Sequence, residues 1–449
     1  MFNVTRIVSH IFRAILVLAS MGLGCAHSKE TVKVMTSFGK EVTAVYKEQF
    51  EAKYPNLTLE FISSPATGAV SHIESLGPAT RPDILWSSSP EVFDTLSRLN
   101  LLSKAGLIDT PMIPSKVRNV NLNDPNGFFR GQALSGYGIM WNTRYIGGKN
   151  LPVPTDWWDL AKPVYFGHVI MSSPTRSGTT HLIVETILQA YGWTDGWRQL
   201  LQIGGNCGEI TERSLDVPEA VKHGRFGVGL VIDFLALSSK YTGSPVEFVY
   251  PPKTTVLPAS IALLKGAMNP AGAKQFMAFT LSQEGQSLLF TPEISRMPVL
   301  TTVYFSVKIP ADFPNLFDVI RKSAMVYDRS VSEQRYSIVN SLFDRLITAH
   351  HTELKRATKS ILDAEYRLSK RPNAKAAQLV AKARALLFSV PISEAQISDP
   401  IFLKEMNSGR AVPGGQSKLS EIEKQLDQEA KENYAKALEL VQSALKIMQ

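Results

Sequence analysis

Cysteine is almost absent from this chain, which has 2 in 449 residues. Two cysteines form neither a disulfide framework nor a cysteine-rich metal site, so both of these classes are excluded. Charged residues make up only 20% of the chain and hydrophobic residues 44%, a composition that supports buried cores and excludes global disorder. After the first 26 residues, no run reaches the roughly 18 apolar residues of a membrane span. A length of 449 residues predicts two or three globular domains.

The N-terminal segment has the three regions of a secretory signal peptide. Arg6 and Arg13 lie in a polar start, an apolar stretch follows to Leu23, and small residues lead up to Ala26. The apolar stretch is too short to span a bilayer. The pattern predicts a signal peptide over residues 1–26 and a mature chain in the periplasm.

Cys25 leaves a second interpretation open, in which a lipid attached to this cysteine anchors the chain. Gly22, three residues earlier, is smaller than the aliphatic residue that such a site prefers. If Cys25 is removed with the signal peptide, Cys207 stands alone, and we expect it to be a small buried hydrophobic residue.

Short strand-like runs alternate with amphipathic helical stretches between residues 31 and 250. The strand-like runs are 32–35, 57–62, 83–86, 137–141, 169–171 and 227–232. Repeated strand and helix units predict a mostly parallel α/β sheet. Because they form two series, we expect two lobes.

Beyond residue 340 the apolar residues recur at three- and four-residue spacing. This spacing predicts two long helices with narrow apolar stripes and a shorter helix over 376–387. Such helices either pack on their own domain or dock onto the helices of a partner. Residues 355–384 hold nine basic and two acidic side chains, which fits an acidic partner, an anionic membrane surface or a solvated helix face.

Hydroxyl-bearing and small residues follow four of the predicted strands directly. These turns cover residues 36–39, 63–68, 87–90 and 172–180. In a doubly wound sheet such turns lie at the carboxyl ends of the strands, where ligands bind. Helix N-termini there favour an anion, although a single Ser or Thr before a helix is usually only a cap.

The turn at 172–180 is longer than a helix cap requires. Ser177, Thr179 and Thr180 offer hydroxyl groups, and Gly178 allows close backbone approach. Arg176 either provides a planar fork for two phosphate oxygens or forms a structural salt bridge. We interpret this turn as an anion-binding site.

Four other polar residues have two interpretations each. Asp233 either accepts hydrogen bonds from ligand hydroxyls or caps a helix, and Tyr137 and His181 either face the cleft or pack in the core. Arg296 either adds positive charge to an anion site or forms a surface salt bridge.

Enzymatic motifs are missing from the sequence. It contains no Gly-x-x-x-x-Gly-Lys-Ser/Thr loop, no Gly-x-Ser-x-Gly elbow and no His-Glu-x-x-His zinc helix. Residues 27–339 hold 29 basic and 27 acidic side chains, a balance that argues against nucleic-acid binding. We expect neither catalysis, nor a metal, nor a cofactor.

Several motifs occur in an order that resembles a known family. They are the segments 134–142, 154–160, 170–180, 257–266, 273–276 and 282–286. Together they resemble the bacterial periplasmic solute-binding proteins of the ferric-iron, phosphonate and sugar-phosphate branch. Within this branch the 173–181 stretch is most like that of members that respond to phosphoglycerate and act with a membrane sensor kinase. Iron-binding members use an adjacent tyrosine pair late in the fold, and this chain has none there.

The resemblance implies an α/β fold of the two-lobed type II periplasmic binding protein class, with hinge strands and a C-terminal α-helical extension. Lobe 1 is expected to cover 27–135 and 258–340, lobe 2 to cover 136–257, and the extension to cover 341–449. The ligand expected in the cleft is a small phosphorylated organic anion, and the expected partner is a membrane sensor kinase or a transporter permease. Another anion or ferric iron is the alternative ligand. The ligand-binding residues implied are Thr175, Arg176, Ser177, Gly178, Thr179 and Thr180 from lobe 2 and Ser37, Ser64, Thr67, Ser88 and Ser89 from lobe 1, to which the residue pattern adds Tyr137 and Asp233.

Overall fold

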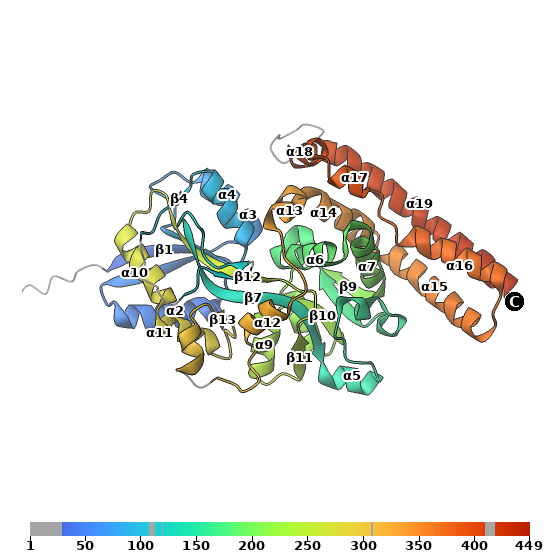
Figure 1. The fold of residues 1–449 in the computed structure, drawn as a ribbon, viewed down its shortest axis with the longest axis horizontal. Helices are drawn as coiled ribbons and strands as arrows, with labels where there is room; N and C mark the ends of the chain where they lie inside the picture. The colour runs from blue at the N-terminus through green and yellow to red at the C-terminus, as the bar shows by residue number, and fades with distance from the viewer. Residues whose placement is uncertain (1–28, 107–112, 119, 307–308, 409–417) are drawn as a thin grey trace, which may run out of the picture.

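The computed structural model describes residues 29–106, 113–118, 120–306, 309–408 and 418–449, without the side chains of Ala66 and Thr67. The predicted signal peptide and Cys25 lie outside these residues, so both remain predictions. Figure 1 shows two α/β lobes side by side and a long helical arm that leaves the second lobe. No helix within the described ranges has both the length and the apolar character needed to cross a membrane.

One mixed sheet runs through both lobes. Its main strands are β1 (Glu30–Thr36), β2 (Leu57–Ser63), β3 (Ile84–Ser87), β7 (Phe129–Asn142), β8 (Val169–Ser172), β9 (Cys207–Thr211), β10 (Val228–Ile232) and β12 (Val256–Leu264), with β4 (Leu102–Ser103), β11 (Val246–Val249) and β13 (Met297–Pro298) at its margins. The order of the main strands is β2-β1-β3-β12-β7-β10-β8-β9. A separate small ribbon pairs β5 (Lys116–Val117) with β6 (Val120–Asn121).

The first lobe is built on the parallel strands β1, β2 and β3. Its helices are α2 (Lys40–Lys53), α3 (Ala66–Ser75), α4 (Pro90–Arg98), α10 (Pro270–Leu281) and α11 (Gln283–Ser287). Trp86 of β3 is fully buried and makes edge-to-face contacts with Phe38, Tyr46 and Phe276, whose ring centroids lie 4.7, 5.0 and 5.7 Å away. Such aromatic pairs add to the free energy gained by burial. This cluster fixes α2 and α10 against the sheet.

The second lobe is built on the parallel strands β8, β9 and β10. Its helices are α5 (Thr143–Lys149), α6 (Gly178–Tyr191), α7 (Trp193–Asn206), α8 (Asp216–Lys222) and α9 (Asp233–Tyr241). Trp157, Trp193 and Trp197 are at most 2% exposed and lie in the core of this lobe. The lobe therefore has a hydrophobic core of its own.

Strand β7 passes from one lobe to the other. Its first half pairs with β12 as far as Gly136, and its second half pairs with β10 from Tyr137 onward. β7 therefore serves as a hinge strand, and its change of partner falls close to the predicted boundary at 135/136.

The helical arm comprises α15 (His351–Lys370), α16 (Ala374–Leu387) and α19 (Lys418–Ile447), with α17 (Glu394–Ile397) and α18 (Pro400–Ser408) between them. Leu354 and Ile361 of α15 are fully buried in the same core cluster as Trp197 of the second lobe. A side chain at Gly205 of α7 would place its Cβ 2.2 Å from the hydroxyl of Thr358, so the two helices touch there. The base of the arm thus packs on its own domain.

The segment just before the arm differs from the expected boundary. We expected lobe 1 to run to residue 340, but Ile338 and Val339 of α14 (Tyr336–Phe343) are buried in the core of the second lobe. Arg335 forms a buried ion pair with Glu185 of α6. The preceding helix α13 (Arg329–Gln334) contacts α4 of the first lobe through an Arg329–Asp94 ion pair, and α12 (Leu316–Lys322) contacts the hinge strands. Because α14 buries its apolar side chains in the core of lobe 2, this helix packs with lobe 2 and not with lobe 1.

Candidate ligand site between the lobes

The carboxyl ends of the parallel strands in the two lobes face each other. In lobe 1 the helices α2, α3 and α4 start just after β1, β2 and β3, and in lobe 2 the helices α6 and α9 start after β8 and β10. A Cβ built on Gly178, at the start of α6, would lie 2.9 Å from the hydroxyl oxygen of Ser89, which precedes α4. The turns 87–90 and 172–180 therefore meet across the cleft.

Most of the helix starts at this cleft are free of side-chain caps. Within the described residues, the N-cap residues of α2, α3, α4 and α9, which are Gly39, Pro65, Ser89 and Ile232, make no side-chain cap bond, although Asp233 accepts one from the N–H of Phe234 in α9. Of these helices only α6 is capped by its N-cap residue, Ser177, which accepts a hydrogen bond from the backbone N–H of Thr180 at 3.1 Å. Uncapped helix N-termini present backbone N–H groups that favour an anion.

Arg296 lies at the centre of this arrangement. Its guanidinium carbon is 4.0 Å from the ring centroid of Phe38 in lobe 1 and 3.6 Å from that of Phe234 in lobe 2. The residue is 2% exposed, and neither Nε nor Nη1 has a hydrogen-bond partner among the described residues. Burial lowers the pKa of Arg296 to about 10, so it is a cation at neutral pH. A buried cation with unpaired N–H groups is costly unless an anion binds it.

The backbone that positions Arg296 is strained. Ser295, the residue before it, has a φ of 45°, which is unfavourable for a residue with a side chain. Met297 and Pro298 then pair with Leu134 and Ala133 of the hinge strand. Strain of this kind persists mainly where the surrounding structure needs a side chain in one place.

Asp233 lies beside Arg296 at the start of α9. It accepts hydrogen bonds from the backbone N–H groups of Gly136 and Phe234 and from the hydroxyl of Tyr250. Burial raises the pKa of Asp233 to about 7. Because its oxygens already bind the protein, Asp233 ties α9 to the hinge strand. Of its two interpretations, the structure places it closer to the capping one.

Tyr137 and the lobe 1 serines surround the same region. Tyr137 is 1% exposed on the hinge strand, and burial raises its pKa well above the usual value; Asp233 and Arg296 both act on it through space. The hydroxyls of Ser37 and Ser87 lie 3.0 Å apart. Ser64 is buried in the turn after β2 and Ser88 is half-buried. Thr67 lies in α3, and its side chain is outside the described set.

The 172–180 turn does not deliver all its side chains to the cleft. Thr180 is buried and bonds to Ser172 and Ser177, and Thr179 is half-buried. Thr175 donates instead to Asp344 at 2.6 Å, in the π-helical segment Asp344–Thr348 from which the arm projects.

Arg176 is not brought together with the other candidate residues. Its side chain is 65% exposed and pairs with Glu212 at 3.0 Å, so the structure matches the salt-bridge interpretation. The short helical turn Pro174–Arg176 places this side chain in solvent.

His181 is buried in the core of lobe 2. Its Nδ1 lies 2.8 Å from the amide oxygen of Asn340 and its Nε2 3.2 Å from the hydroxyl of Ser332. His181 also lines the cavity of about 670 Å³ that Ser89 and Gly178 line, so the structure fits both of its interpretations.

Glu91 was not singled out in the sequence, yet it lies in the first turn of α4 beside the cleft. It lines a cavity of about 670 Å³ together with Ser89 and Gly178. Its Oε1 is buried with no partner in the described part of the chain. Burial raises the pKa of Glu91 to about 7, although hydrogen bonding to its own backbone N–H group and the charge of Arg329 lower this pKa.

This pKa predicts a pH-dependent stability. Folded Glu91 holds a proton that the unfolded chain releases between about pH 4.5 and 7, so its contribution to stability falls as pH rises through that window. We expect Glu91→Gln to gain stability relative to the wild type between about pH 5 and pH 8, by about 2 kcal/mol in urea unfolding. Glu212→Gln, on the surface, is the matched control. An equal response of the two variants to pH would contradict the assignment.

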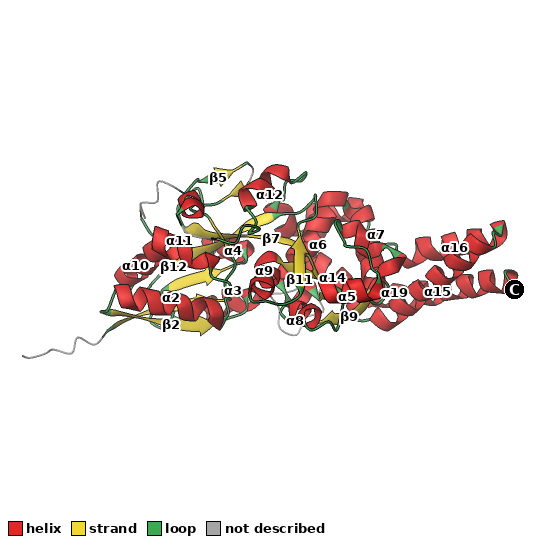
Figure 2. Cartoon of the chain, turned by 90° about the horizontal axis from the view of Figure 1, so that it is seen from below, coloured by secondary structure: helices red, strands yellow, loops and turns green. Residues whose placement is uncertain are grey.

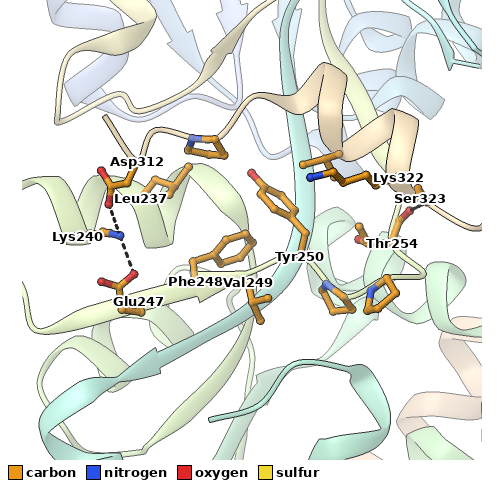
Figure 3. Close-up of a pocket in the computed structure, with 14 residues that line it drawn as sticks. Leu237, Lys240, Glu247, Phe248, Val249, Tyr250, Thr254, Asp312, Lys322 and Ser323 are labelled. Carbon is orange, nitrogen blue, oxygen red and sulfur yellow. Dashed lines mark hydrogen bonds and ion pairs between the residues drawn. The ribbon is translucent and has the colours of Figure 1, made fainter. Parts of the chain in front are cut away.

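A second cavity, of about 340 Å³, adjoins Tyr250 and is shown in Figure 3. Its Lys240 contacts both Glu247 and Asp312 at 2.7 Å, so its positive charge is already neutralised. None of the residues implied for ligand binding lines this cavity. Arg296 is therefore a better candidate for an anion site than this cavity.

From the sequence, Arg296 has two interpretations, and neither Phe38 nor Phe234 is predicted to be a site residue. The three residues are separated by more than 60 positions, and no local periodicity signals their contact. The missing adjacent tyrosine pair was the only signal that drew attention to the segment around Arg296.

Comparison with known proteins gives a consistent result. The family model described as bacterial extracellular solute-binding protein matches residues 79–312. The phosphoglycerate transport regulatory protein PgtC of Salmonella typhimurium is 30% identical over 387 residues, which cover 85% of this chain and 91% of PgtC. An uncharacterised protein of Haemophilus influenzae is 28% identical over 210 residues, covering 46% of this chain and 59% of that protein.

Solved structures with the same fold include two binding proteins. The periplasmic binding protein AfuA of Actinobacillus pleuropneumoniae, with fructose 6-phosphate bound, has a TM-score of 0.61 at 22% identity, covering 71% of this chain and 98% of AfuA. Iron-bound HitA of Pseudomonas aeruginosa has a TM-score of 0.56 at 17% identity, covering 73% of this chain and 99% of HitA. These matches confirm the predicted type II periplasmic binding protein fold, and the predicted helical extension is present as α15 to α19. The chain belongs to the bacterial extracellular solute-binding protein family.

Proposed function

We propose that this protein captures a small phosphorylated organic anion, of the phosphoglycerate type, between its two lobes. After removal of residues 1–26 it acts in the periplasm and reports the bound anion to a membrane sensor kinase, or delivers it to a transporter permease. It performs no catalysis. The observation that carries the proposal is the buried, unpaired guanidinium of Arg296 between the rings of Phe38 and Phe234.

The position of Arg296 suits a ligand-dependent closure. A ligand shifts the balance between open and closed forms only if it binds one form better. An anion at Arg296 is within reach of helix starts from both lobes, since Phe38 precedes α2 and Phe234 lies in α9. We infer that the anion holds the lobes together.

The alignment with PgtC supports a regulatory role. It covers 85% of the chain, about 382 residues, which is more than the 340 that precede the arm. The alignment therefore reaches into the helical arm, and the name of that relative refers to regulation of phosphoglycerate transport. The alternative is a transporter component for another phosphate ester or a phosphonate, because AfuA was solved with fructose 6-phosphate. Ferric iron is a weaker alternative.

Calorimetric titration of the mature chain tests the proposal. We expect phosphoglycerate and phosphoenolpyruvate to bind with Kd at or below about 10 μM, and glycerate, the matched control without phosphate, to bind at least about 100-fold more weakly. Fructose 6-phosphate, methylphosphonate and ferric citrate complete the panel. Tighter binding of one of these three would establish the alternative, and no heat with any phosphate ester would contradict the proposal.

A further inference from the structure

The far end of the helical arm carries a cluster of cations, which we call the basic tip. It consists of Tyr366, Arg367, Lys370, Arg371, Lys375, Lys446 and Ile447, all of them exposed. These residues come from the end of α15, the start of α16 and the last turns of α19. Figures 1 and 2 show these three helix ends together at the extremity of the molecule opposite lobe 1.

The charges of the basic tip are unbalanced. Residues 366–375 hold four basic side chains and no acidic one. Elsewhere on the arm several exposed lysines pair with a nearby carboxylate, as in Lys359–Asp363 and Lys431–Asp427, both at 2.7 Å, although Lys382 and Lys424 are exposed without such a pair in the part of the chain that the structure describes. Within the described ranges, no ion pair is formed by any of the five cations of the basic tip, Arg367, Lys370, Arg371, Lys375 and Lys446. The positive charge is therefore available to an anionic partner.

Helix stability accounts for only part of this cluster. Cations near the C-terminal ends of α15 and α19, such as Lys370 and Lys446, are favoured by the helix dipole. Lys375 lies in the first turn of α16, where the same dipole disfavours a cation. Arg371 is the C-cap residue of α15, where the dipole favours a cation as well. The dipole therefore accounts for Arg371 but not for Lys375.

Large apolar side chains are exposed among the cations. Tyr366 is 66% exposed with the Nζ of Lys370 5.4 Å from its ring centroid, and Ile447 is 38% exposed. An amphipathic aromatic residue beside lysines and arginines is typical of the interface between water and lipid.

We propose that the basic tip binds the anionic phospholipid headgroups of a bilayer surface. The tip forms the end of a projecting arm (Figure 1), so a flat membrane can reach its cations without meeting the lobes. The exposed Tyr366 and Ile447 beside the cations favour a lipid surface over an acidic protein. Contact at this end places the two lobes away from the bilayer, at the length of α15, which is about 30 Å for 20 residues. The proposal does not depend on which anion the cleft binds.

Sedimentation with vesicles tests the proposal on the full mature chain. The vesicles contain phosphatidylethanolamine with about one third phosphatidylglycerol, and neutral phosphatidylcholine vesicles are the reference. We expect binding to the anionic vesicles only, with release at about 1 M salt, where charges are screened within about 3 Å. Each basic residue near an anionic surface strengthens binding about fivefold, so a quadruple variant loses about two to three orders of magnitude. That variant carries Arg367→Gln, Lys370→Gln, Arg371→Gln and Lys375→Gln.

A second quadruple variant controls for net charge. Lys33, Lys104, Lys265 and Lys274 are exposed lysines of lobe 1, and their change to Gln removes the same charge. We expect this variant to bind vesicles as the wild type does, and both variants to keep the wild-type Tm and ligand affinity. Equal loss in both variants, or no binding of the wild type to anionic vesicles, would overturn the proposal. Salt-sensitive retention by immobilised polyglutamate without vesicle binding would assign the tip to an acidic protein instead.

Discussion

Arg296→Met is expected to weaken binding of the phosphorylated anion by about 100-fold or more while leaving the ligand-free protein as stable as the wild type, or more stable. The two unpaired nitrogens of Arg296, Nε and Nη1, each gain a charge-assisted hydrogen bond when an anion binds, worth about 1.5–3 kcal/mol apiece. Without ligand, the same buried charge lacks a hydrogen-bonded partner, and an apolar side chain of similar size avoids that cost. Titration calorimetry and Tm of the free protein measure the two effects.

Two further variants make this test specific. Arg296→Lys keeps a charge but loses the planar fork, so we expect an intermediate affinity. Arg176→Met removes the exposed arginine that pairs with Glu212 and is expected to leave affinity unchanged. If Arg176→Met abolished binding and Arg296→Met did not, the ligand would sit at the 172–180 turn, as the sequence alone suggested.

In contrast to Arg296→Met, Arg335→Met is expected to destabilise the folded protein. We expect the free energy of unfolding to fall by about 3–5 kcal/mol, or the Tm by about 10 °C. Arg335 is 7% exposed and makes a two-pronged pair with Glu185 of α6, with Nε to Oε1 at 2.9 Å and Nη2 to Oε2 at 2.7 Å. Its removal leaves Glu185, which is fully buried, with an uncompensated charge. Urea unfolding and thermal scans measure the loss.

The double variant Arg335→Met with Glu185→Leu is the control for this prediction. Replacing both partners of a buried pair by apolar residues is often close to neutral, so we expect it to recover most of the lost stability. Equal instability of the single and double variants would show that packing around α14, and not the unpaired carboxylate, explains the effect. The comparison of Arg296 with Arg335 thus separates a cation kept for a ligand from one kept for the fold.

Much of the α/β core could be predicted from local patterns. The runs 32–35, 57–62, 83–86, 169–171 and 227–232 correspond to β1, β2, β3, β8 and β10, because buried parallel strands are short apolar runs. The first half of β7 was missed. Its buried Gln132 bonds to Tyr46 and Trp86, so it is a strand that lies inside the protein without an apolar sequence.

The candidate site was predicted by region and not by residue. The turns after the strands do meet across the cleft at Ser89 and Gly178. Which side chains they contribute depends on packing, so Thr175 bonds to Asp344 and Arg176 bonds to Glu212 outside the cluster around Arg296.

The sequence by itself determined the class of fold, the helical arm and the edge of the sheet at which a ligand is expected, since these depend on the spacing of apolar residues and on turn chemistry along the chain. Only the tertiary structure decided which arginine lies between the lobes. Arg296 lies there because Met297 and Pro298 pair with the hinge strand, and because Phe38 and Phe234 pack on the guanidinium from opposite lobes. Contacts between residues so distant in the chain depend on how the lobes pack together, which no local pattern encodes.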